Sequence, residues 1–110
     1  MSFDPQAPNA SAIQAINAQA SVLMKRGIAL INQAELTAVE EALSCFDRAL
    51  ALRRQLPIDT DPALRYDLAA CWLNRADALI RLGSAEQVSL AVQSYDEGIV
   101  LLQGLPLGRQ

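Results

Sequence analysis

The chain repeats itself at an offset of 49 residues, and this repeat limits the fold more than any other feature of the sequence. Residues 23–57 align with residues 72–106 without a gap, and ten of the 35 aligned pairs are identical. Further pairs keep their size or chemistry, such as Phe46 and Tyr95. An ungapped match over this length predicts that both halves fold into the same supersecondary unit and stack on each other.

Each half has the pattern of two helices. Apolar and small residues recur at spacings of three and four, and no stretch alternates between polar and apolar residues long enough to make a strand. Capping boxes, prolines and a glycine mark the expected helix ends. The sequence therefore predicts an all-α fold of four antiparallel helices. These run from Ser11 to about Gln33, from Thr37 to Pro57, from Pro62 to Leu82 and from Ser84 to about Gly104.

The same signals predict the domain organisation. A chain of 110 residues suits one domain, and 52% apolar residues supply enough material for a core. We expect this domain to span residues 11–106, with hairpins at about 11–57 and 60–106. Residues 1–10, with two prolines, are expected to form a flexible lead-in, and residues 107–110 a short tail.

Composition argues against several classes of partner. The net charge is −3 and no basic cluster is present, so binding to nucleic acid phosphates is not expected. No run of 18 apolar residues occurs, which argues against a membrane span. The start of the chain lacks the pattern of a secretory signal, so the expected location is cytoplasmic.

Catalysis is not expected either. The chain has no histidine, and its two cysteines, Cys45 and Cys71, are far apart in the sequence and fall within apolar helical patterns, where free cysteines pack as small hydrophobes. We predict no metal and no cofactor. A small-molecule-binding bundle stays a minor alternative, because convergent polar groups are not evident in the sequence.

Large and small residues recur within each half in a pattern that resembles the tetratricopeptide repeat family. The resemblance covers about residues 11–106, although the period of 49 residues is longer than the usual ~34. It implies two stacked helical hairpins, as a fragment of a right-handed superhelix. The second half matches at Trp72, Ala76, Leu79, Gly83, Ala91, Tyr95, Gly98 and Pro106, and the first at Leu23, Gly27, Leu30, Ala42, Phe46, Ala49 and Pro57.

The resemblance also implies a binding surface for a peptide or a partner protein. In that family the first helix of each hairpin lines a concave face. A known groove of this kind grips a C-terminal carboxylate, but only Asn74 matches its ligands, so we do not expect carboxylate binding. Transferred position by position, the concave-face set is Met24, Lys25, Ile28, Asn32, Leu73, Asn74, Asp77 and Arg81.

Two charge pairs recur at the same spacing of 21 residues. Arg26 precedes Asp47 by this distance, and Arg75 precedes Asp96. We expect each pair to join the two helices of its own hairpin and to fix their register.

The last helix is apolar on more than one side. Repeat arrays usually have three or more units and a polar cap at the end, and this chain has two units. The predicted association face is Ile99, Leu102 and Leu105. Its expected role is the association of two copies, docking on another chain, or continuation into a longer array, and an oligomerisation module is the alternative to peptide binding.

Overall fold

A computed structural model describes residues 9–105, all of whose regular structure is helical. The all-α prediction is therefore confirmed for this part of the chain. Residues 1–8 of the predicted lead-in and the predicted tail, residues 107–110, lie outside the described residues, while Asn9 and Ala10 form the start of α1. The four helices are α1 (Ala10–Ile31), α2 (Leu36–Arg53), α3 (Pro62–Leu82) and α4 (Ala85–Gln103).

The caps of α3 and α4 form as the sequence predicts. Asp61 accepts a hydrogen bond from the Ala63 amide, and Pro62 takes the first position of α3. Gly83 ends α3 with a φ of 81°, a left-handed conformation that favours glycine. Ser84 then opens α4 with a complete capping box.

The predicted caps of α1 and α2 are wrong. Asn9 caps α1 by accepting a hydrogen bond from the Ala12 amide, so Ser11 lies inside the helix. Glu35 holds the cap position of α2 without a side-chain hydrogen bond, and Thr37 lies within the first turn. In both places the helix begins earlier than the Ser or Thr that fits the capping-box pattern.

These caps give a first prediction. Ser84→Ala should lower the free energy of unfolding by about 1 kcal/mol, because the Gln87 amide loses its acceptor. Thr37→Ala, by contrast, should change it by less than about 0.5 kcal/mol, since the exposed Thr37 caps nothing and alanine is the better helix former. Urea denaturation followed by circular dichroism measures both. A larger loss for Thr37→Ala would contradict the cap assignment.

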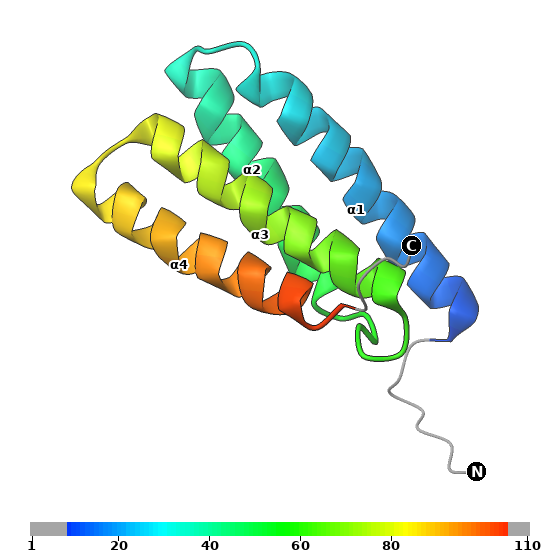
Figure 1. Cartoon of the computed structure of the whole chain (residues 1–110). Helices are drawn as coiled ribbons and strands as arrows, with labels where there is room; N and C mark the ends of the chain where they lie inside the picture. Colours follow the sequence, from blue (N-terminus) through cyan, green and yellow to red (C-terminus); the bar gives the residue numbers. More distant parts are fainter. Residues whose placement is uncertain (1–8, 106–110) are drawn as a thin grey trace, which may run out of the picture.

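Consecutive helices run antiparallel and pack in chain order (Figure 1). α1 packs on α2 and α3 on α4, which makes two hairpins, and α2 packs on α3 to join them. Contact between α1 and α3 is slight. The two outer helices, α1 and α4, therefore each have one face with no helix of residues 9–105 against it.

Small residues allow the helices of each hairpin to approach closely. A Cβ atom at Gly27 would lie 2.5 Å from Cε1 of Phe46, and one at Gly98 would lie 2.7 Å from Cδ2 of Leu73. Both glycines are buried. The small residues of the repeat therefore face large ones on the partner helix, as the sequence pattern predicts.

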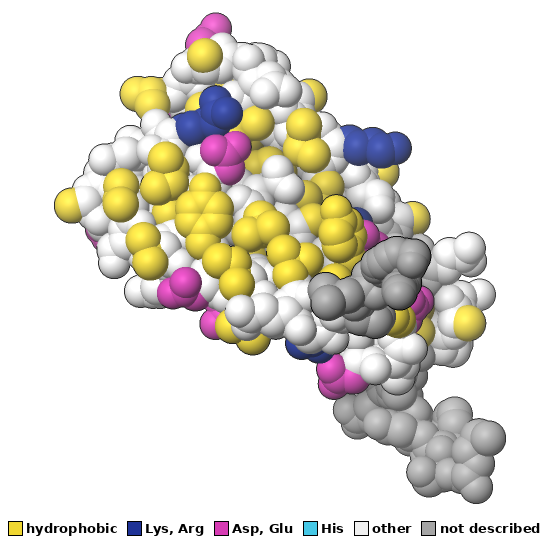
Figure 2. All heavy atoms as spheres, viewed as in Figure 1, with side chains coloured by type: hydrophobic (Ala, Val, Ile, Leu, Met, Phe, Trp, Pro, Cys, Tyr) yellow, Lys and Arg dark blue, Asp and Glu magenta, His cyan; other side chains and the backbone are white. Residues whose placement is uncertain are grey.

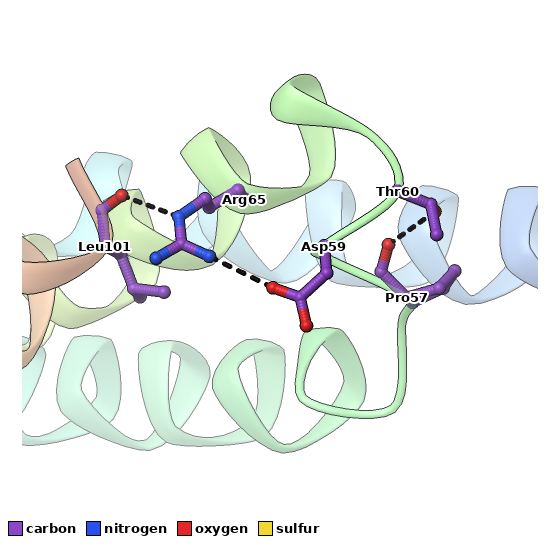
Figure 3. A network of polar contacts seen from close by, with 5 residues as sticks. All are labelled: Pro57, Asp59, Thr60, Arg65 and Leu101. Atoms are coloured by element: carbon purple, nitrogen blue, oxygen red, sulfur yellow. Dashed lines mark hydrogen bonds and ion pairs between the residues drawn. The ribbon is translucent and has the colours of Figure 1, made fainter. Parts of the chain in front are cut away.

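Arg65 ties the loop between the hairpins to the end of α4 (Figure 3). Its Nε donates to the Leu101 carbonyl at 2.9 Å, and another guanidinium nitrogen lies 3.2 Å from the Asp59 carboxylate. In the same loop the Thr60 hydroxyl donates to the Pro57 carbonyl at 2.8 Å. Arg65 thus gives a second donor to a carbonyl of the last turn of α4, which also accepts from the Gly104 amide at 3.2 Å.

Candidate binding surfaces

Two members of the predicted concave-face set serve packing. Met24 is buried in the main core cluster with residues of α2 and α3. Leu73 is half-buried, and its side chain fills the space beside Gly98 on α4. The structure therefore places Met24 in the core and Leu73 between α3 and α4.

The other six members keep some exposure. Lys25 and Ile28 are exposed on α1, and Asn32 is exposed at its C-cap. On α3, the Asn74 amide donates to the Ala70 carbonyl of its own helix at 2.8 Å. Asp77 and Arg81 form an ion pair one turn apart, at 3.4 Å.

Neither predicted charge pair within a hairpin forms. Arg26 is bound to Glu41 at 2.7 Å, while Asp47 accepts from Arg75 of the next hairpin at 2.6 Å. Asp96 makes no ion pair with any described residue. The expected partners were wrong because Asp47 lies on the side of α2 that faces α3, so its carboxylate joins the two hairpins.

A row of five side chains along α4, here named the α4 stripe, is only partly covered: Tyr95 and Leu102 are half-buried against the core, whereas Val88, Val92 and Ile99 are exposed. Its members lie at spacings of four and three, so they share one face over the length of the helix. Val92 is 53% exposed and Ile99 is 46% exposed. The stripe consists of Val88, Val92, Tyr95, Ile99 and Leu102.

The predicted association face overlaps the α4 stripe. Ile99 and Leu102 belong to it, and Leu105 is half-buried just beyond the end of α4. Figure 2 shows hydrophobic side chains gathered over α3 and the adjoining side of α4. Val100 is also exposed, but a helical wheel places it on another side of α4.

The equivalent row on α2 is covered. At the offset of 49 residues the stripe corresponds to Val39, Leu43, Phe46, Leu50 and Arg53. Four of these are buried, and Leu43 is half-buried. The row contributes to cores that also contain Leu68, Cys71 and Leu79 of α3. The same face of the hairpin is thus interior in the first repeat and open in the second.

A hollow of about 440 Å³ lies between α2 and α4, with Trp72 of α3 among its lining residues. Arg54 lies over the Trp72 ring at 4.8 Å from the ring centre, and Arg75 lies at 5.9 Å. The Trp72 side chain is half-buried and packs against the main core cluster. Arg75 is already paired to Asp47, whereas Arg54 and Glu97, which also line the hollow, form no ion pair with a described residue.

The sequence reading missed Arg53, which is only 5% exposed where three helices meet. Its guanidinium donates to the side chains of Asn17 and Ser21 on α1, both at 3.1 Å. Toward α3 it donates to the Asp67 carbonyl at 3.3 Å and to the sulfur of Cys71 at 3.4 Å. The arginine breaks the apolar pattern of α2, and this break was the signal available in the sequence.

Both cysteines are free and buried, as predicted. Burial raises the pKa of the Cys71 thiol above its ordinary value, and the nearby Arg53 opposes this shift in part. Among the described residues no group of three or more Cys, Asp or Glu side chains is placed to hold a metal ion.

None of the helices between Asn9 and Leu105 is both long and apolar enough to cross a lipid bilayer. The cytoplasmic location stays a prediction. Comparisons with protein-family descriptions, with curated proteins and with solved structures found no match for this chain.

Proposed function

We propose that this chain is a non-catalytic protein-interaction module built from two tetratricopeptide-like hairpins, and that its main binding surface is the α4 stripe. The observation that carries the proposal is the exposure of Val88, Val92 and Ile99 in this row, whose equivalents on α2 are buried or half-buried. Exposed apolar side chains that share one helix face are typical of sites that bind other proteins. An amphipathic helix laid along the row would bury it.

The concave face is the second candidate surface for a protein or peptide. Its support is the exposed side chains Lys25, Ile28 and Asn32 of α1 and its C-cap, together with the ion pair of Asp77 and Arg81 on α3. Two of its expected contacts, Met24 and Leu73, are engaged in packing. We therefore rank this surface below the α4 stripe.

The association of two copies through α4 is the alternative role of the stripe. An isologous contact would run the two α4 helices against each other about a two-fold axis. The Asp96 carboxylates, next to the centre of the stripe, would then lie close together and repel. We therefore favour a different chain as the partner.

Photo-crosslinking in the cells of origin tests the proposal. A benzophenone amino acid in place of Val92 should form an adduct with another protein, and the same group in place of the exposed Ile28 should not. An adduct of twice the 11.9 kDa chain mass at position 92 would indicate self-association instead. Adducts at position 28 alone would favour the concave face, and no adduct at either position would refute the proposal.

A matched pair of variants serves as the control. Ile99→Glu should abolish the adduct formed from position 92, because a carboxylate within the stripe has to be desolvated on binding. Val22→Glu, at a residue that is 67% exposed on α1, should leave the adduct unchanged. Both should alter the free energy of unfolding by less than about 1 kcal/mol, since both residues are exposed.

A further inference from the structure

The joint between the two hairpins is the contact of α2 with α3, and it can be compared with the outer face of α4. On α2 the side chains of Val39 and Leu50 are buried in the core that residues of α3 complete. At the edge of this contact Arg75 of α3 donates to the Asp47 carboxylate at 2.6 Å. The joint therefore combines an apolar row with one ion pair at its rim.

The outer face of α4 reproduces the α2 half of this joint. Val88 is identical to its equivalent Val39, and Ile99 replaces Leu50 by a residue of similar size. The equivalent of Asp47 is Asp96, which is exposed and has no basic partner within residues 9–105. The acceptor for an arginine is thus present, and the arginine is missing.

The charge of α4 points in the same direction. Its sequence contains three acidic residues, Glu86, Asp96 and Glu97, and no lysine or arginine. Two α4 helices from two copies would therefore repel, whereas a helix with basic residues beside its apolar row would be attracted.

α1 of a second copy is a poor match, although it is the repeat equivalent of α3. Exposed Gln19 of α1 and Gln33, just beyond its end, stand where α3 has Leu68 and Leu82. The free face of α1 keeps the exposed Val22 but has lost these two leucines, so it offers less apolar surface than α3.

We propose that the α4 stripe binds an amphipathic helix of another protein whose contact face resembles that of α3, with an arginine that pairs with Asp96. This inference rests on the proposed function and adds the chemistry of the partner. The helix needs large apolar residues at spacings of three and four, and its arginine takes the place that Arg75 has at Asp47. The apolar row supplies affinity, and the ion pair fixes the register of the bound helix.

A labelled peptide with the sequence of residues 62–82 serves as the probe. Added to the intact chain, it should bind in fluorescence anisotropy, and the Ile99→Glu variant should reduce its affinity at least tenfold. A peptide of residues 10–31, which carries Gln19 where the first peptide has Leu68, should bind at least tenfold more weakly. Equal affinity of the two peptides, or no binding of the first, would overturn the inference.

A charge swap separates pairing from general electrostatics. Asp96→Arg in the chain should weaken the first peptide about tenfold, and the peptide variant Arg75→Asp should restore most of this loss. Glu97→Arg, next to Asp96 but lining the hollow beside Trp72, should change the affinity less than threefold. Equal losses for Asp96→Arg and Glu97→Arg, or no rescue, would refute the arginine pairing.

The outcomes of the two experiments are distinguishable. If position 92 crosslinks to another protein but the charge swap does not restore peptide affinity, the α4 stripe is still the binding surface and the assigned partner chemistry is wrong. If position 92 yields no adduct and the peptide does not bind, both proposals fail.

Discussion

Arg53→Ala should lower the free energy of unfolding by about 4 kcal/mol, the largest effect that we expect from a single substitution. The variant loses four hydrogen bonds to α1 and α3 and leaves the half-buried side chains of Asn17 and Ser21 without the donor that Arg53 supplies. A buried polar group without a partner costs about 1–3 kcal/mol, and the lost aliphatic stem leaves a cavity. Urea denaturation followed by circular dichroism measures the loss.

Two controls make this result specific. Arg48→Ala removes an exposed arginine from the same helix and should change the free energy of unfolding by less than about 0.5 kcal/mol. Arg53→Leu introduces the residue found at the equivalent position 102 and should recover about half of the loss, because leucine fills the space but bonds none of the acceptors. If Arg53→Ala unfolds no more easily than Arg48→Ala, the bonds of Arg53 contribute no stability.

Gly27→Val should lower the free energy of unfolding by about 3 kcal/mol. The added atoms would overlap the ring of Phe46, which is fully buried and has no free space into which to turn. Overpacking of this kind typically costs about 1–3 kcal/mol, and the rigid backbone on both sides places this site at the upper end. Thermal unfolding followed by circular dichroism should show a lower Tm in proportion.

The comparison variant is Ala29→Val, at an exposed position two residues further along α1. There the same β-branched side chain meets solvent, so only the small difference in helix propensity remains, about 0.5 kcal/mol. A similar loss in both variants would show that α1 and α2 are not held at close distance by Gly27.

Helix positions were readable from the sequence where local chemistry alone decides them. α3 begins at Pro62 and ends at Leu82 as predicted, because a proline, an aspartate cap and a glycine fix its ends. At the start of α2 the pattern favoured Thr37, but the helix begins before it. The start of such a helix depends on how far packing extends its first turn, and the spacing of apolar residues in the sequence does not reveal this.

The candidate surfaces were predictable only in part. Ile99 and Leu102 were recognised because an apolar face at the end of a repeat array needs a cover, and Ile99 is indeed exposed. Met24 was placed on the concave face by family resemblance, but its side chain belongs to the core. A family resemblance assigns residues to positions along a helix. Because the repeat of this chain is longer than the usual one, the same position can face the neighbouring helix instead of the concave surface.

The charged residues were the hardest to place. Asp47 and Arg75 each recur in the repeat, so spacing alone could not show that they pair with each other across the two hairpins. Arg53 has no counterpart in the second half, where Leu102 stands, and the repeat therefore gave no guide to it.

The hydrogen bonds of Arg53 also constrain the order in which the helices pack during folding. Half of its acceptors, Asn17 and Ser21, come from α1, and the other half, the Asp67 carbonyl and Cys71, come from α3. A guanidinium cannot leave water before its acceptors are in place, since burying an uncompensated charge is prohibitively costly. The first hairpin alone supplies only two of them, so its α2 face stays hydrated until α3 arrives, and the two halves of this chain become one cooperative unit.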